Sequence, residues 1–274
     1  MFKLGMINSA WEQTGQPLVW GLEKTKQLGF DTVDIFLDPT EKGSAPKVRQ
    51  IVSTCKRLKL PIKSVCCCAL GIADFNPSVR EFHVARVKKY LDMTKTFGAH
   101  NLLLVLGEYM WQQEVIPPKA QWDWAVEACR ELGAYAKKKK LEIALELEPF
   151  KLSLLRDMGE MVHFLDECGQ PQVKANIDIS HMVLSKTPPS ALRALKGRAA
   201  HVHISDCDGK VHGDLPPGRG VVDFIPYLKE IGVTGVGSGV VSLELEYSPD
   251  PAKIEDWVKE AYDSTRKLMA AAGI

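Results

Sequence analysis

The sequence predicts a single (β/α)₈ barrel, an α/β fold in which eight parallel strands alternate with helices. Eight short apolar runs recur along the whole chain, segments with helical periodicity lie between them, and glycines stand where several helices are expected to end. A length of 274 residues suits one such barrel. We therefore expect one domain that covers residues 1–274.

The eight apolar runs are the predicted strands. They are nearly continuous instead of alternating with polar residues, as is typical of parallel strands that helices cover on the outside. No Gly-x-Gly-x-x-Gly turn follows the first run and no phosphate-loop pattern occurs, which disfavours an open nucleotide-binding sheet. The runs occupy residues 2–7, 32–36, 62–67, 101–106, 143–147, 173–177, 200–204 and 240–245.

The segments between the runs carry helix signals. One helix is expected to start at Asn76 and Pro77, because asparagine caps helices and proline in the first turn lacks only an N–H that would be unbonded there. Apolar residues then repeat at helical spacing over 84–91. Three glycines are expected to end helices in the left-handed conformation before the next strand begins. These are Gly29, Gly98 and Gly232.

Composition and charge restrict the possible partners. Thirty-five basic and 34 acidic residues leave a formal charge of +1, so nothing in the overall charge favours a nucleic acid partner. The sequence shows neither a secretion signal nor a membrane span. The expected partner is a small molecule, with neither nucleic acid nor membrane.

The cysteines indicate a reducing compartment. Seven are present, an odd number without the spacing of a zinc ribbon or a disulfide framework, so we expect a cytoplasmic protein. Cys66, Cys67 and Cys68 are consecutive in a predicted strand and point to alternate faces, so they are expected to be small core residues.

Titratable residues gather at the ends of the last four predicted strands, where barrel enzymes carry their active sites. Buried carboxylates without partners would be destabilising, and few cations are available to pair with them, which predicts one bound divalent ion. A ligand set dominated by oxygen favours Mn²⁺, with Mg²⁺ or Co²⁺ as alternatives. The strand ends carry Glu146, Glu148, Asp178, His201, His203 and Glu244.

Position along each strand separates expected ligands from structural residues. Glu148 stands just before Pro149 at a strand end, so its carboxylate is expected at the barrel mouth, whereas Glu146 is expected to pair with a lysine inside. Asp178 could instead cap a helix, but His181 three residues later favours a ligand. His201 is expected to be a hydrogen-bonded inner histidine.

These motifs resemble the xylose isomerase-like barrel superfamily, in particular its sugar isomerase and epimerase branch. The resemblance covers essentially the whole chain. Its most specific parts are the Glu-Pro ending of strand five, Asp178-x-x-His181, His201-Val-His203-Ile-Ser-Asp206, His212, Gly218-Arg-Gly-Val-Val-Asp223-Phe and Ser242-Leu-Glu244.

The resemblance implies a ligand set and a reaction. Glu148, Asp178, His203 and Glu244 would bind the metal, and Glu148 and Glu244 would also serve as acid and base on opposite faces of the substrate. The reaction would be epimerisation or isomerisation of a sugar or keto-sugar by proton abstraction beside a carbonyl, through an enediolate. His181, His212, Glu108 and Trp111 would contact the substrate, the last two from the predicted loop 106–119.

Two departures from ketohexose 3-epimerases keep other substrates open. Those enzymes carry an arginine six residues after the metal-binding histidine and a second glutamate six residues after the first, where this chain has Gly209 and Leu154. The alternative is therefore a metal-dependent lyase or dehydratase acting on an inosose or a 3-keto-glycoside. Oligomers are common in the family that this chain resembles, so we include a second copy of the chain among the expected partners.

Two other classes of function rank behind these. An endonuclease IV-like DNA repair enzyme needs histidines at the ends of strands three and four, where this chain reads Cys66-Cys-Cys-Ala69 and Leu106-Gly-Glu-Tyr109. A non-catalytic sugar-binding barrel would have no use for four clustered metal-ligand side chains.

Overall fold

The computed structural model confirms the predicted barrel. It describes residues 1–110, 115–246 and 248–274. All eight predicted strands are present, all neighbouring pairs are parallel, and the order around the sheet is β1-β8-β7-β6-β5-β4-β3-β2. The strands are β1 (Lys3–Met6), β2 (Val33–Phe36), β3 (Ile62–Cys68), β4 (Asn101–Val105), β5 (Glu142–Leu145), β6 (Val173–Asp178), β7 (Ala199–Ile204) and β8 (Val240–Leu243).

The barrel is nearly closed, and its seam lies between β1 and β2. A parallel bridge joins Ile7 to Asp34, and the Asn8 backbone N–H donates to the Asp34 carbonyl at 3.0 Å. The Asn8 side-chain oxygen accepts from the Phe36 backbone N–H at 2.6 Å, so an amide side chain continues the pairing where the backbone does not. The seam therefore depends on few backbone contacts.

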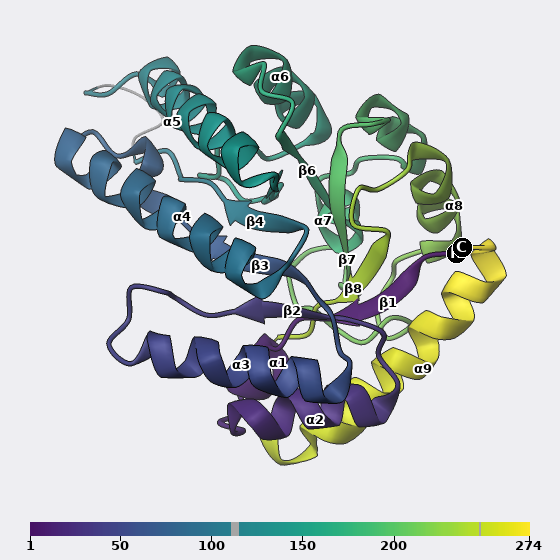
Figure 1. Cartoon of the computed structure of the whole chain (residues 1–274). Coiled ribbons are helices and arrows are strands. Elements are labelled where there is room, and N and C mark those ends of the chain that lie inside the picture. Colours follow the sequence, from purple (N-terminus) through teal and green to yellow (C-terminus); the bar gives the residue numbers. More distant parts are fainter. Residues whose placement is uncertain (111–114, 247) are drawn as a thin grey trace.

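Helices surround the strands, as Figure 1 shows. Asn76 caps α4 by accepting from the Ser78 N–H, and Gly29 and Gly98 end α2 and α4 in the left-handed conformation, as predicted. The helices are α1 (Ser9–Glu12), α2 (Leu18–Leu28), α3 (Ser44–Leu58), α4 (Pro77–Phe97), α5 (Pro118–Lys139), α6 (Met158–Cys168), α7 (Ile179–Leu184), α8 (Phe224–Thr234) and α9 (Ile254–Ala272), with short 3₁₀ turns η1 (Leu70–Ala73), η2 (Pro189–Leu195) and η3 (Pro251–Lys253).

The prediction for Gly232 is wrong. Gly232 lies inside α8, which continues to Thr234, and Gly235 ends the helix with a φ of 77°. A Cβ at Gly232 would stand 2.9 Å from a side-chain carbon of Ile274, so the glycine allows the C-terminus to pack closely against α8. Gly232 is therefore required for this close contact and does not mark the end of a helix.

The apolar core joins the strands to the surrounding helices, and a small separate cluster lies inside the barrel. That cluster consists of Ile7, Cys66 and Leu103, with Val105 packed against it. Cys67 is buried as predicted, whereas Cys68 is exposed, contrary to the prediction, because it stands at the last position of β3 where the strand opens to the barrel mouth.

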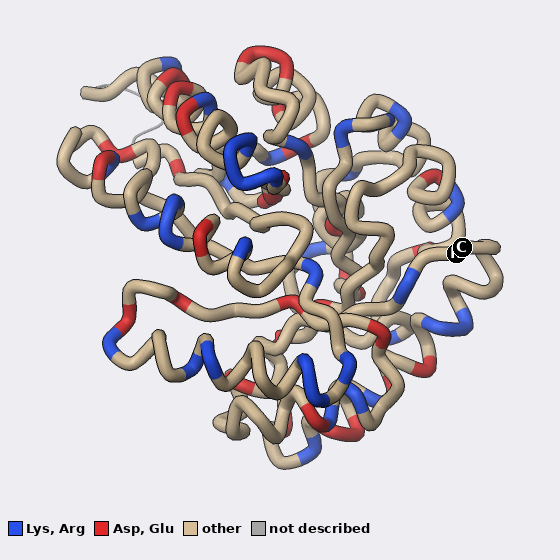
Figure 2. Tube along the Cα trace, viewed as in Figure 1, with Lys and Arg blue, Asp and Glu red and all other residues tan. Residues whose placement is uncertain are grey.

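Charged residues of both signs are interspersed along the outer helices (Figure 2). Within the described residues, no helix is long and apolar enough to cross a membrane.

Candidate active site

Three of the four predicted ligands meet at the carboxyl ends of neighbouring strands. Asp178 is the last residue of β6, His203 pairs with it in register on β7, and Glu244 directly follows β8. One ligand atom from each of these side chains lies within 4.8 Å of the others. Asp178 and His203 are almost completely buried, and the Glu244 side chain is 20% exposed, so the group faces the barrel mouth.

Several polar atoms in this region are buried without a hydrogen-bond partner. Asp178 Oδ1 accepts from the His181 backbone N–H and from the Ser180 hydroxyl, each at 2.9 Å, but Asp178 Oδ2 has no partner. Both ring nitrogens of His203 also lack one, although Nδ1 lies 2.9 Å from a Glu244 oxygen. Buried polar groups are normally satisfied, so these atoms fit a site that binds a cation. The donor set of carboxylate oxygens and imidazole suits a divalent metal.

The electrostatics of the cluster are those of carboxylates held too close together. Burial raises the pKa of Glu244 well above its usual range, and the neighbouring charges of Asp214 and Asp178 raise it further. Burial alone would also raise the pKa of Asp178, but the positive charges of His181 and His203 outweigh it and lower that pKa to about 2. A bound cation would stabilise the ionised form of both carboxylates.

Strand five contributes differently from the prediction. Glu146 is 4% exposed, and it forms a second group with Asp178 and His181 whose ligand atoms also lie within 4.8 Å of one another. One Glu146 oxygen accepts from Asn176 Nδ2 at 2.7 Å, and the other has no hydrogen-bond partner. No lysine pairs with Glu146 among the described residues, where its recorded ion-pair neighbour is His181 at 3.3 Å.

Glu148 belongs to none of the ligand groups found among the described residues. Its backbone N–H donates to the Leu155 carbonyl at 2.8 Å, and its side chain lines the cavity above the ligands. Burial raises the pKa of Glu148 to about 7, with the negative charge of Glu146 adding to the shift. The strand ends at Leu145, two residues earlier than expected, and the strand-five carboxylate that groups with Asp178 is that of Glu146. A metal-ligand role for Glu148 stays a prediction.

The two predicted substrate histidines lie together on the cavity wall. His181 Nδ1 donates to the Leu147 carbonyl at 2.6 Å, and its Nε2 lies 2.9 Å from His212 Nδ1. His212 Nε2 is in turn 2.9 Å from Asp214 Oδ2. The Phe150 ring packs edge-on against both imidazoles, with centroids 6.2 and 5.7 Å away. These contacts fix both rings in place.

Two adjoining cavities open at the barrel mouth. The central cavity, of about 220 Å³, is lined by Glu146, Glu148 and Glu244 among other residues. The side cavity, of about 200 Å³, shares Cys68, Val105, Glu146, Glu148 and Phe150 with it. The central cavity is lined by Ile7, Ser9, Phe36, Cys66, Cys67, Cys68, Leu103, Val105, Glu146, Glu148, Phe150, His181, His212, Glu244 and Glu246. The side cavity is lined by Cys68, Leu70, Val105, Leu106, Gly107, Glu108, Glu146, Glu148, Phe150, Ser153, Leu154 and Leu155.

The structure describes one of the two remaining residues that were predicted to contact the substrate. Glu108 lines the side cavity and forms an antiparallel bridge with Ser153. Trp111 lies outside the described residues.

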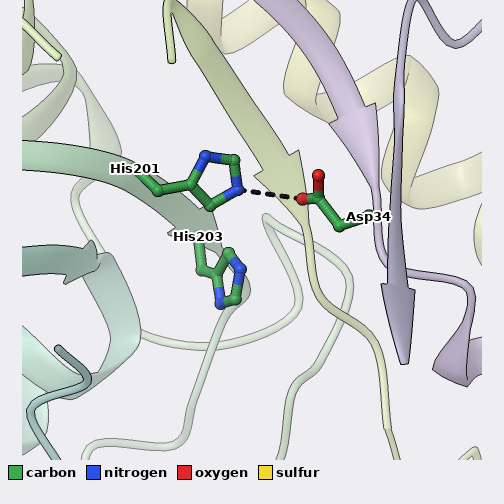
Figure 3. Close-up of side chains that lie close together, drawn as sticks. All are labelled: Asp34, His201 and His203. Atoms are coloured by element: carbon green, nitrogen blue, oxygen red, sulfur yellow. Dashed lines mark hydrogen bonds and ion pairs between the residues drawn. The ribbon is translucent and has the colours of Figure 1, made fainter. Parts of the chain in front are cut away.

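A buried ion pair supports the site from inside the barrel (Figure 3). Asp34 Oδ2 lies 2.9 Å from His201 Nε2, and His201 Nδ1 lies 3.0 Å from the Ser238 hydroxyl. The His201 ring packs edge-on against His203, with centroids 5.2 Å apart. His201 is therefore the hydrogen-bonded inner histidine that the sequence predicted. Asp34 was missed, although a lone acid inside an apolar run is a signal that could have found it.

Comparison with known proteins gives a family and two similar epimerases. A family model described as xylose isomerase-like TIM barrel matches residues 22–268. A D-psicose 3-epimerase of Ruminiclostridium cellulolyticum is 24% identical over 247 residues, which cover 87% of this chain and 82% of that protein. An L-ribulose-5-phosphate 3-epimerase UlaE of Salmonella heidelberg is 24% identical over 267 residues, covering 91% and 92%.

Solved structures share the fold. The IOLI protein, determined with a binding zinc atom, superposes with a TM-score of 0.84 at 17% identity over 98% of both chains. A 3-keto-D-glucoside 4-epimerase, YcjR, of E. coli superposes with a TM-score of 0.81 at 18% identity over 98% of this chain and all of that one.

Proposed function

The chain belongs to the xylose isomerase-like TIM barrel family, and from this premise we propose that it is a divalent-metal-dependent epimerase or isomerase of a small keto-sugar. The observation that carries the proposal is the convergence of Asp178, His203 and Glu244 at the barrel mouth, with buried polar atoms that lack partners. The sugar 3-epimerases among its relatives support the reaction class.

We assign the metal site to Glu146, Asp178, His203 and Glu244. Glu146 replaces Glu148 in this assignment because its carboxylate is buried, has an oxygen without a hydrogen-bond partner and forms a ligand group with Asp178 and His181. Mn²⁺ is the proposed ion, with Mg²⁺ or Co²⁺ as alternatives, because three of the four ligands are carboxylates. When bound, such an ion stabilises negative charge that develops on the substrate oxygens during proton removal.

The side chains around the cavity would perform the proton transfers. Glu148 follows β5 and Glu244 follows β8, and both line the central cavity, so each can reach one face of a sugar held between them. His181 and His212, held by Leu147, by Asp214 and by each other, would contact the substrate from the wall of the central cavity. The burial of the cavity floor limits competing protonation by water.

Two measurements test this function. The purified protein, reconstituted with Mn²⁺, should hold about one ion per chain by elemental analysis and should catalyse exchange of a substrate C–H for deuterium in ²H₂O. Glu148→Gln and Glu244→Gln should each abolish that exchange, and the exposed Glu131→Gln on α5 is the matched control. Full exchange in both cavity variants would remove these carboxylates from the acid and base roles.

A second candidate, elimination from a 3-keto-glycoside or an inosose, is favoured by the residues that replace the ketohexose contacts. The position six residues after the strand-five ligand is leucine whether the count starts at Glu146 or at Glu148, and Gly209 stands where an arginine would. Release of an aglycone or of water from the same substrates would identify this activity, whereas exchange without release identifies epimerisation.

A further inference from the structure

We propose that the substrate is an uncharged sugar that bears an apolar substituent, with the sugar in the central cavity and the substituent in the side cavity. The inference rests on the proposed function, because it requires the reacting sugar to lie beside the cluster of carboxylates and histidines. Three features of the two cavities carry it: their charge, their apolar lining and their combined size.

The charge of the cavities disfavours a phosphorylated sugar. Among the described residues that line them, none is lysine or arginine, whereas Glu146, Glu148, Glu244 and Glu246 are present. The residues outside the described part, 111–114 and 247, include no basic residue either. A phosphate carries close to two negative charges and is bound by basic side chains or several N–H donors.

Arg86, a basic residue whose side chain reaches Cys68 at the edge of the cavities, already binds other groups of the protein. Arg86 donates to the Cys68 carbonyl at 2.6 Å and forms an ion pair with Asp38 at 2.6 Å. A phosphate would have to displace Asp38 to use it, so the site favours a neutral substrate.

The side cavity offers an apolar surface for a substituent. Its wall combines leucines with Val105 and the edge of Phe150, and Leu70 is 50% exposed there although it is apolar. The small cluster of Ile7, Cys66 and Leu103, with Val105 packed against it, continues this apolar wall into the central cavity. A free sugar has hydroxyl groups all round and would leave the leucine wall in contact with water. The leucines are Leu70, Leu106, Leu154 and Leu155.

The size of the two cavities agrees with a sugar that bears a substituent. Each cavity, at about 220 and 200 Å³, is smaller than the roughly 300–1,000 Å³ of most small-molecule sites. Because they share five lining residues, they form one continuous site that reaches that range. A single monosaccharide in the central cavity would leave the adjoining space unfilled.

Calorimetric binding of unreactive glucosides to the Mn²⁺-loaded and the metal-free protein tests the inference. Phenyl β-D-glucopyranoside should bind with a Kd at least about tenfold lower than methyl β-D-glucopyranoside, since the ring removes apolar surface from water. Glucose 6-phosphate should bind more weakly than either glycoside. Equal affinity for the two glycosides, or tighter binding of the phosphate, would overturn the inference.

A substitution in the side cavity tests whether the apolar substituent binds there. Leu70→Asp should remove most of the preference for the phenyl glucoside and leave the Kd of the methyl glucoside within about twofold. Val233→Asp, which changes an exposed apolar residue of α8 that lines neither cavity, should leave both values unchanged. A phenyl preference that survives Leu70→Asp would overturn the placement in the side cavity.

The outcome is separable from that of the proposed function. Deuterium exchange into an unsubstituted neutral keto-sugar, together with equal glycoside affinities, would retain the proposed function and reject this inference. Failure of exchange with every keto-sugar and keto-glycoside would instead reject the proposed function.

Discussion

Replacing Glu146 by glutamine should abolish the stabilisation of the protein by Mn²⁺. An ion that binds only the folded state stabilises it by about 2.7 kcal/mol when its concentration is one hundred times the Kd. A stability change of 1 kcal/mol moves the Tm of a domain approaching this size by about 2–4 °C, so the wild-type protein should gain about 5–10 °C. The variant should gain less than about 2 °C under the same conditions.

The structure explains why glutamine is the informative replacement at this position. Glu146 accepts from Asn176 Nδ2 with one oxygen, and a glutamine carbonyl can keep that hydrogen bond. The other oxygen, which has no hydrogen-bond partner and lies 3.3 Å from His181 Nδ1, is replaced by an NH₂ group that cannot bind a cation. Removing one negative charge relieves repulsion with Asp178 and also removes the ion pair with His181, so the Tm of the metal-free variant should stay close to that of the metal-free wild type.

Differential scanning fluorimetry with and without Mn²⁺, after stripping with a chelator, measures both effects. Glu148→Gln is the matched control, because it makes the same chemical change two residues away in the same cavity, and it should keep the metal-dependent rise in Tm. The reverse pattern, in which Glu148→Gln loses the rise and Glu146→Gln keeps it, would refute the assignment of the strand-five ligand.

Two further predictions concern the stability of the fold. Asp34→Ala should lower the free energy of unfolding by about 3–5 kcal/mol in urea titrations, because it leaves His201 buried without its carboxylate; a loss below 1 kcal/mol would show that the pair is dispensable. For Glu142, burial raises the pKa, but hydrogen bonds from His100 and Lys174 outweigh it and lower that pKa. Its contribution to stability is present above the unfolded value of about 4.3 and is lost as pH falls through the folded value. The urea midpoint of the wild type should therefore fall more steeply below pH 5 than that of Glu142→Gln, and parallel curves would contradict this.

The fold was predictable because its signals are local and repeated. Each strand is a short apolar run, and caps such as Asn76 and Gly98 mark helix ends through the backbone geometry that those residues favour. Gly232 failed because a glycine required for close packing looks the same in sequence as a glycine at a helix end. Only the three-dimensional contact with Ile274 separates the two.

The candidate site was predictable in its location and less so in its detail. Asp178, His203 and Glu244 follow from strand ends alone, since parallel strands bring their carboxyl ends to one place. The choice between Glu146 and Glu148 depends on where β5 stops, and strand ends are poorly defined by sequence because the apolar run continues through Leu147. Asp34 carries a local signal as a lone acid inside an apolar run, but its partner His201 lies 167 positions away and cannot be identified from the local sequence.

The narrow seam between β1 and β2 gives the barrel an uneven mechanical character. Here the amide of Asn8 stands in for missing backbone pairing, next to Ser9 and Phe36, which line the central cavity. Thermal opening of the barrel should therefore begin at this seam and reach the cavity wall before it disturbs the other seven pairs of neighbouring strands. Weakening the hydrogen bond to Asn8 would change how often the central cavity opens while most of the barrel stays folded. Substitutions at this seam could therefore alter substrate access without altering the residues that perform the chemistry.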